Sequence, residues 1–148
     1  MTRTSRSFSF ALAVALAATS AQAEEIGQIK TARGAVSVER AGQALAGSVG
    51  LRLEVADVIK TGADGAAGIT MADNSLLSVG PNSILALSRF EYEPSTSQGR
   101  LDAQLQRGTL AVVSGRLAKQ SPQAMTVRTP SAALAVRGTE FVVAAQGE

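Results

Sequence analysis

The sequence predicts a single all-β domain behind an N-terminal export segment, and three observations support that prediction. Apolar and polar residues alternate with a period of two over many short stretches, which is the pattern of half-buried strands. Glycine, asparagine and proline interrupt these stretches at short intervals, as tight turns require. Helical periodicity is nearly absent after residue 24. We expect a short β-solenoid or roll of stacked short strands, with a compact β-sandwich as the alternative.

Residues 1–23 have the three regions of a cleavable signal peptide. Two arginines make the start positive, an apolar run of about 11 residues follows from Phe8, and Ala21-Gln22-Ala23 has the small-x-small pattern that signal peptidase cuts. A membrane-spanning helix needs about 20 apolar residues, so this run is too short to be an anchor. We therefore expect cleavage between Ala23 and Glu24, and a location in the periplasm, with an extracellular location as the alternative.

The alternating stretches give the strands in order along the chain. Short ones consist of a polar residue between two apolar ones, and they are centred on Ser37, Thr70 and Thr126. The clearest case is Leu101, Ala103 and Leu105, which alternate with polar residues. Since side chains of a strand point alternately to its two faces, each stretch is expected to turn one apolar face to the core.

Motifs that favour tight turns separate these strands. They are Arg33-Gly34, Ala41-Gly42, Thr61-Gly62, Asp64-Gly65, Asp73-Asn74, Gly80-Pro81-Asn82, Arg107-Gly108 and Ser114-Gly115. Residues 94–99 are expected to form a loop, and residues 117–124 a loop or a short helical turn. A small repeat supports the stacked arrangement: Asn74-Ser75-Leu76-Leu77-Ser78-Val79 recurs eight residues later as Asn82-Ser83-Ile84-Leu85-Ala86-Leu87. A plain hairpin meander explains this repeat about as well.

The composition excludes several classes of function. The chain has no cysteine and no histidine, which removes disulfides, thiol catalysis and the usual zinc sites. Aromatic residues make up 3% of the sequence, so the core must be aliphatic. Without Arg3 and Arg6, the 14 basic residues become 12, equal to the 12 acidic ones. The mature chain is therefore about neutral, and no nucleic-acid partner is expected.

A set of turn-and-strand segments follows in order along the chain: 32–38, 55–62, 67–83, 90–92, 105–110 and 127–141. Together they resemble the FecR-type domain, named for the periplasmic regulator of ferric citrate uptake, over about residues 27–144. The resemblance implies an all-β interaction module spanning residues 24–148. Sensor-type members carry a cytoplasmic anti-sigma segment and a membrane helix before this domain, where we expect a signal peptide. The resemblance therefore supports the domain and not a sigma-factor role.

The motif residues of this resemblance are expected to be structural: Asp57, Thr61, Gly62, Asp73, Ser75, Thr129, Pro130, Arg137, Gly138 and Thr139. Pro130 cannot donate to a sheet ladder, so it belongs at the end or edge of a strand. Gly138 permits a bulge or tight bend, with Arg137 and Thr139 bonded to neighbouring backbone. The functional alternative is that Arg137 grips a carboxylate or a sugar.

Metal binding and catalysis find little support in the sequence. Asp57, Asp64 and Asp73 lie near turns but lack the density of acids in a calcium loop. No motif places a nucleophile beside a base, and a solvated strand edge explains the carboxylate pair Glu91 and Glu93. We expect no metal, no cofactor and no enzymatic activity.

Two hypotheses of function remain open from the sequence. The first is a protein-binding module of envelope signalling or assembly, whose unknown partner adds a strand to an exposed sheet edge. The second is a module that binds cell-wall glycan or another carbohydrate. Phe90 and Tyr92 point to one face of a strand, where they either fill the core, as we expect, or stack on a sugar or a partner.

Overall fold

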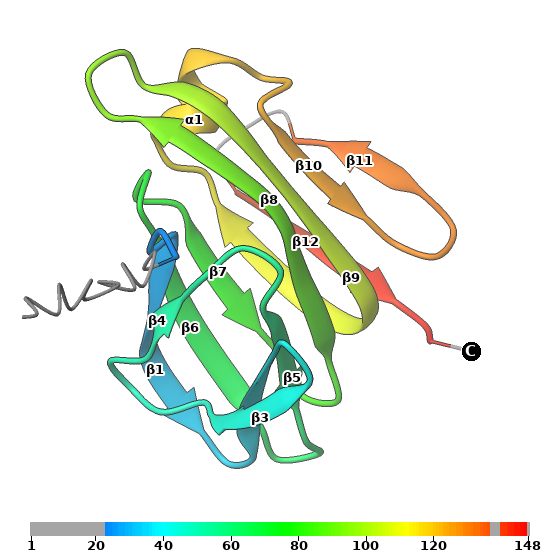
Figure 1. The fold of residues 1–148 in the computed structure, drawn as a ribbon. Helices are drawn as coiled ribbons and strands as arrows, with labels where there is room; N and C mark the ends of the chain where they lie inside the picture. The colour runs from blue at the N-terminus through cyan, green and yellow to red at the C-terminus, as the bar shows by residue number, and fades with distance from the viewer. Residues whose placement is uncertain (1–22, 137–139, 148) are drawn as a thin grey trace, which may run out of the picture.

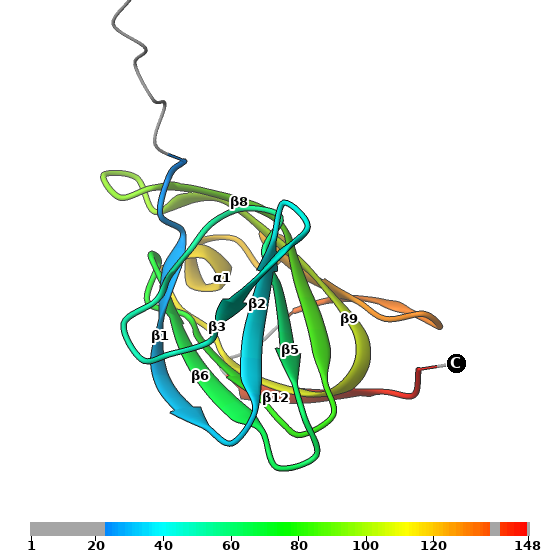
Figure 2. The same cartoon turned by 60° about the horizontal axis from the view of Figure 1, so that its bottom comes forward.

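The computed structural model describes residues 23–136 and 140–147, which form one curled β-sheet around one aliphatic core (Figure 1). Strands make up 58% and helix 4% of these residues, so the predicted all-β class is confirmed. The finer prediction of a solenoid is not confirmed, because the sheet curls into an open half-barrel (Figure 2). The expected signal peptide lies outside the described residues up to position 22, and Ala23 and Glu24 are exposed.

The curled sheet consists of two halves that share strand β9 (Gln98–Val113). Half-sheet A contains, in spatial order, β4 (Arg52–Leu53), β1 (Gly27–Arg33), β6 (Ala66–Met71), β7 (Leu76–Val79), the end of β9 and β12 (Glu140–Ala145). Half-sheet B contains β3 (Gln43–Ala46), β2 (Val36–Arg40), β5 (Val58–Thr61), β8 (Ile84–Glu93), the start of β9, β10 (Met125–Arg128) and β11 (Ala133–Ala135). All neighbours are antiparallel except β9 and β10, which run parallel.

Strand β9 passes from one half-sheet to the other by bending at Arg107 and Gly108. Leu105 lies opposite Leu85 of β8, and Leu110 lies opposite Val79 of β7. The ladder shifts register at this bend, and Gly108 has a positive φ of 94°. The expected turn at Arg107-Gly108 is therefore wrong: the motif is a bulge inside a continuous strand, where it raises the local bend and twist.

The inward faces of both half-sheets build the core that the alternation predicted. Leu101, Ala103 and Leu105 are all at most 3% exposed, which confirms the inward face of the clearest alternating stretch. In β8 the inward-facing positions shift by one residue after Leu87, because Ser88 forms a second bulge opposite β9. The strand's later residues Phe90 and Tyr92 are consequently half-buried against the core, as expected for core filling.

The two copies of the repeat do not stack as rungs. They form β7 and β8, which pair with different halves of β9 and not with each other. A short helix, α1 (Arg116–Gln120), follows β9 and covers one end of the core with Leu117 and Ala118. It confirms the helical alternative for residues 117–124.

A loop at residues 47–51 ties the two half-sheets together on the side opposite β9. The N–H of Gly47 donates to the carbonyl of Val36 at 3.0 Å, in half-sheet B. The N–H of Gly50 donates to the carbonyl of Ile29 at 2.8 Å, in half-sheet A. The residues before position 57 thus supply both strands at this seam and the loop that joins them.

Candidate interaction surfaces

Asp57 is buried and held by a bidentate ion pair. It is fully buried, and Arg40 donates to its two carboxylate oxygens at 2.8 and 2.7 Å. The N–H of Glu54 donates to the same carboxylate at 2.9 Å, and Arg40 also pairs with the Glu54 side chain at 3.0 Å. The hydrogen bond with Asp57 is the main cause of a raised pKa for Arg40. Since these groups satisfy one another, Asp57 fixes the turn between β4 and β5.

Asp73 and Ser75 tie the first repeat to the end of β9. Both are fully buried, and the Ser75 hydroxyl donates to Asp73 Oδ2 at 2.7 Å. The N–H of Gly115 donates to Ser75 Oγ at 3.0 Å, and the N–H of Leu117 donates to Asp73 Oδ2 at 3.2 Å. Asp73 thereby accepts from a backbone N–H in the first turn of α1, a group that the helix itself leaves unpaired.

The second repeat has the same construction at the other end of this segment of β9. Ser83 is fully buried, and its Oγ accepts from the N–H of Thr109 at 3.0 Å. Thr61 Oγ1 accepts from the Ser83 N–H at 2.9 Å and donates to the Gly80 carbonyl at 2.6 Å. Gly62 accepts from the N–H of Asn82 at 3.0 Å. The repeated serine therefore anchors a strand to β9 in both copies.

These networks leave the motif residues of the interior without a free group for a ligand. The hydrogen bonds described above join the side chains of Asp57, Asp73, Ser75 and Ser83 to other groups of the same chain. Among the described residues, no group of three acidic, histidine or cysteine side chains is placed to hold a metal ion. A binding surface is therefore expected on the outside of the sheet.

Thr129 and Pro130 form the turn that joins β10 and β11. The N–H of Thr129 donates to the Ala132 carbonyl at 2.7 Å, and Thr129 Oγ1 accepts from the Ala132 N–H at 3.1 Å. Pro130 is exposed in this turn, outside the sheet ladder. The turn presents β11 as an outer strand whose three residues are all exposed. Arg137, Gly138 and Thr139, which follow, lie outside the described residues.

Strand β12 forms another open edge among the described residues, besides those of β3, β4 and β11. Its ladder partner is β9, and within the described residues no strand pairs with its second edge (Figure 1). Val142 is 69% exposed, and it faces outward with two further exposed apolar residues, Leu76 and Val113. Leu76 lies opposite Val113 in the ladder between β7 and β9. We call Leu76, Val113 and Val142 the outer patch of half-sheet A.

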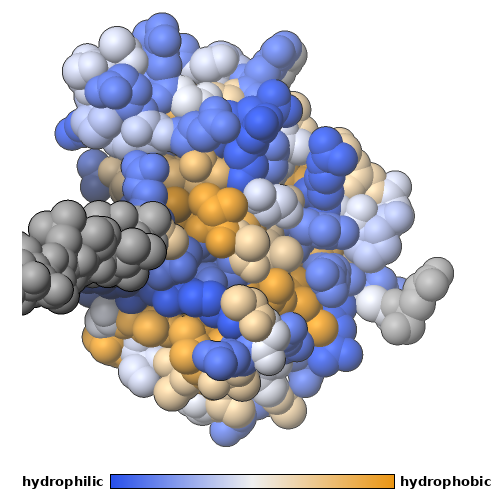
Figure 3. All heavy atoms as spheres, viewed as in Figure 1, coloured by the Kyte–Doolittle hydropathy of each residue, from blue (hydrophilic) through white to orange (hydrophobic). Residues whose placement is uncertain are grey.

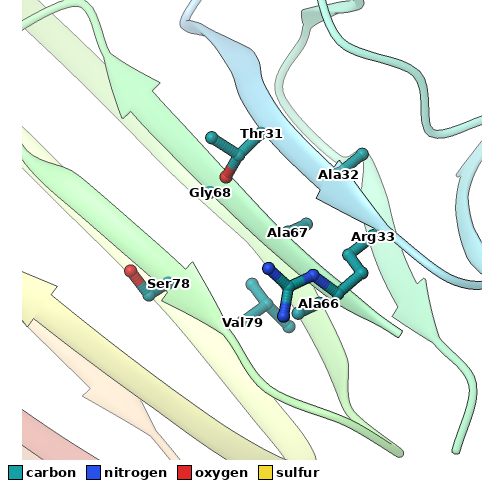
Figure 4. A pocket seen from close by; sticks show the side chains of 8 residues that line it. All are labelled: Thr31, Ala32, Arg33, Ala66, Ala67, Gly68, Ser78 and Val79. Atoms are coloured by element: carbon teal, nitrogen blue, oxygen red, sulfur yellow. The ribbon is translucent and has the colours of Figure 1, made fainter. Parts of the chain in front are cut away.

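A shallow hollow of about 410 Å³ lies farther along half-sheet A (Figure 4). Its floor includes Gly68, where an added Cβ would lie 2.3 Å from Thr31 Oγ1. Thr31 and Ser78 bring hydroxyls to the hollow, and Arg33 extends its guanidinium over one end. Arg33 is exposed and forms no ion pair with the described residues. The hollow thus combines one cation with hydroxyl groups.

The arm formed by the end of β8 and the start of β9 is hydrophilic (Figure 3). On its outer face Arg89 pairs with Glu91 at 3.4 Å, and Arg100 pairs with Asp102 at 3.1 Å. Glu93 ends β8, and its pKa is lowered by hydrogen bonds from the hydroxyl and N–H of Ser95 in the turn that follows. Paired charges of both signs explain a solvated arm, so we assign no site to it.

The comparison with protein families decides what kind of domain this is. The model of the FecR family, described as FecR protein, matches residues 57–148. The chain belongs to the FecR family. No curated protein and no solved structure matches the chain. Membership of the FecR family indicates a function related to envelope signalling, and no helix among the described residues is long and apolar enough to span a membrane.

The match with the FecR family begins at Asp57, whereas the resemblance seen in the sequence extended back to about residue 27. Strands β1 to β4 lie before the match, yet β1 pairs with β6 and β2 pairs with β5. Sequence reasoning named Asp57 but missed Arg40, its partner 17 residues earlier. It named Arg33 only as part of a turn motif and missed Val142, because nothing in their local pattern indicates which face of which half-sheet they occupy.

Proposed function

We propose that this FecR-family protein is an exported, non-enzymatic module that binds a protein of the bacterial envelope by accepting a strand at the open edge of β11. The observation that supports this proposal is the exposure of all three residues of β11, on an edge that no other strand of the described residues pairs with. Native proteins usually block such edges, because unpaired N–H and C=O groups recruit other strands. A short edge without lysine or proline, held out by a defined turn, suits recognition of an extended segment.

The direction of the backbone groups on β11 follows from two hydrogen bonds. The N–H of Val136 donates to the Met125 carbonyl at 3.0 Å, and the Ala132 carbonyl accepts from Thr129 at 2.7 Å. The backbone N–H and C=O groups at positions 132, 134 and 136 therefore point toward β10. Because backbone groups alternate along an antiparallel strand, Ala133 and Ala135 direct their N–H and C=O to the open edge. Their methyl side chains let a partner strand approach closely.

Site-specific photo-crosslinking in living cells tests the proposal. A photoreactive residue at Ala133 is expected to capture a defined envelope protein, while one at Ala63, exposed in the turn between β5 and β6, is not. Ala133→Pro removes an N–H that faces the partner and none that faces β10, so it should abolish capture from position 135 and leave the far-UV spectrum unchanged. Equal capture at positions 133 and 63, or capture that survives Ala133→Pro, would refute the assignment.

Export is part of this proposal and rests on the pattern of residues 1–23. Signal peptidase is expected to cut after Ala23, which is exposed together with Glu24 ahead of the first strand. Mass spectrometry of the protein from a periplasmic fraction should give an N-terminus at Glu24. An intact leader on a cytosolic protein would contradict export.

A second candidate function is binding of cell-wall glycan, and the hollow beside Arg33 favours it. An unpaired guanidinium suits a sugar or peptide carboxylate, and the Thr31 and Ser78 hydroxyls suit sugar hydroxyls. Arg33→Ala should then reduce cosedimentation with purified peptidoglycan at least several-fold. Arg116→Ala, which removes an exposed arginine from α1, should not. The absence of any cosedimentation of the wild-type protein would eliminate this candidate.

A further inference from the structure

Strand β12 is an edge that no other described segment pairs with, and its composition is unusual for a surface. It runs for 6 residues, and Glu140 is its one charged residue. Val142 is the most exposed large hydrophobic residue among the described residues, at 69%. Lysine, proline or a bulge would block further pairing, and β12 has none of them. The edge is therefore suited to receive another strand.

The groups that β12 offers can be derived from the ladder around β9. The N–H of Gly80 donates to the Thr109 carbonyl at 3.0 Å, so Thr109 faces β7. Because backbone groups alternate in direction, Leu110 and Val112 point their N–H and C=O groups at β12, where their partners are Val143 and Phe141. The intervening residues of β12 then direct their N–H and C=O to the open edge, and they are Glu140, Val142 and Ala144.

We propose that β12 pairs antiparallel with β12 of a second copy of this chain, about a two-fold axis at Val142. In this register Val142 lies opposite Val142 of the second copy, and the two residues exchange both backbone hydrogen bonds. Glu140 lies opposite Ala144, and Phe141 lies opposite Val143. Outward residues therefore meet outward residues, and inward residues meet inward ones.

The register is complementary in hydrogen bonding, and it also avoids repulsion between like charges. The two Glu140 carboxylates lie at opposite ends of the paired strands, so no like charges face each other. The paired Val142 side chains extend the outer patch of Leu76 and Val113 across the axis, which joins the two half-sheets A into one continuous surface. An isologous contact of this kind closes as a dimer and leaves no further β12 edge.

This dimer uses an edge different from the one proposed for the partner protein. The partner adds to β11, in half-sheet B, and the second copy adds to β12, in half-sheet A. Photo-crosslinking at Ala133 and the oligomeric state therefore report on separate proposals, and either can fail while the other holds.

Sedimentation equilibrium of the mature protein tests the dimer. The wild-type protein is expected to give the mass of two copies, and Val142→Lys the mass of one, because a lysine at the axis places two ammonium groups opposite each other. Val49→Lys is the matched control: Val49 is 63% exposed in the loop at residues 47–51, away from β12, and this variant should remain dimeric. A monomeric wild-type protein at every soluble concentration, or a dimeric Val142→Lys, would overturn the proposal.

Cysteine cross-linking tests the register, since the natural chain has no cysteine. A short bismaleimide should join two copies of Val142→Cys efficiently and two copies of Val49→Cys poorly. The yield of cross-linked dimer should fall for Ala145→Cys, because residue 145 lies far from residue 145 of the second copy. Equal cross-linking of all three variants, or attachment of position 142 to another protein in cells and not to itself, would contradict β12 self-pairing.

Discussion

Gly108 is the residue at which β9 changes half-sheet, and it packs closely against Ser83. Its φ of 94° disfavours other residues, and an added Cβ would lie 2.0 Å from Ser83 Oγ. Gly42 is the matched control, because its φ is 78° but no atom lies within 4 Å of the added Cβ. Gly42→Ala should lower the free energy of unfolding by about 1–2 kcal/mol from backbone strain alone.

Gly108→Ala should cost roughly 1–3 kcal/mol more than Gly42→Ala, because it adds overpacking against the buried serine of the second repeat. Urea unfolding of both variants and the wild-type protein measures this difference. Equal losses of stability would show that Ser83 yields without cost, so that the bend does not depend on close packing at Gly108.

The sequence predicted the structural role of single residues but not their hydrogen-bond partners. The resemblance to the FecR-type domain singled out Asp57, Asp73 and Ser75 as structural residues, and aspartates near turns commonly cap them. It could not give Gly115 as the partner of Ser75, because 40 residues separate them and only the folding of β9 brings them together. The repeat held the clue: both serines accept an N–H from the β9 chain, Ser75 from Gly115 and Ser83 from Thr109.

At the scale of elements, the turn at Thr129 determines how firmly β11 is presented. Thr129→Val keeps the β-branched shape but removes the hydroxyl that accepts from the Ala132 N–H. The loss of about 1 kcal/mol should raise amide exchange in β11 about five-fold and leave the rest of the sheet unchanged. Thr126→Val, on β10 itself, is the control and should leave exchange in β11 as it is. Unchanged exchange in Thr129→Val would mean that pairing with β10 alone holds the strand.

Strand positions were easier to predict than strand lengths. The alternation at Leu101, Ala103 and Leu105 gave the inward face correctly, since a period of two is a local property. The strand containing them is 16 residues long, and its second half continues beyond the glycine that indicated a turn. A glycine with positive φ serves a turn or a bulge equally well, so only the neighbours of Gly108 decide between them.

At the scale of the whole molecule, the sequence predicted the class and the core but not the curl. An aliphatic interior and short strands fit both a solenoid and a half-barrel, because both bury one face of every strand. The arrangement depends on which strands pair, and β9 decides it by taking β8 along one half and β7 along the other. Those pairings join residues up to about 40 positions apart in the chain, for example Leu76 with Val113, which local patterns do not encode.

The residues before the family match are part of the same folding unit as the matched segment. A fragment of residues 57–148 contains the matched segment but lacks β1, which pairs with β6, and β2, which pairs with β5. It also leaves the buried Asp57 without Arg40, and breaking such a pair costs about 3–5 kcal/mol. We expect no cooperative thermal transition from this fragment and a cooperative one from residues 24–148, both followed by circular dichroism. A cooperative transition of the fragment would show instead that β5 to β12 fold without the N-terminal strands that close the sheet.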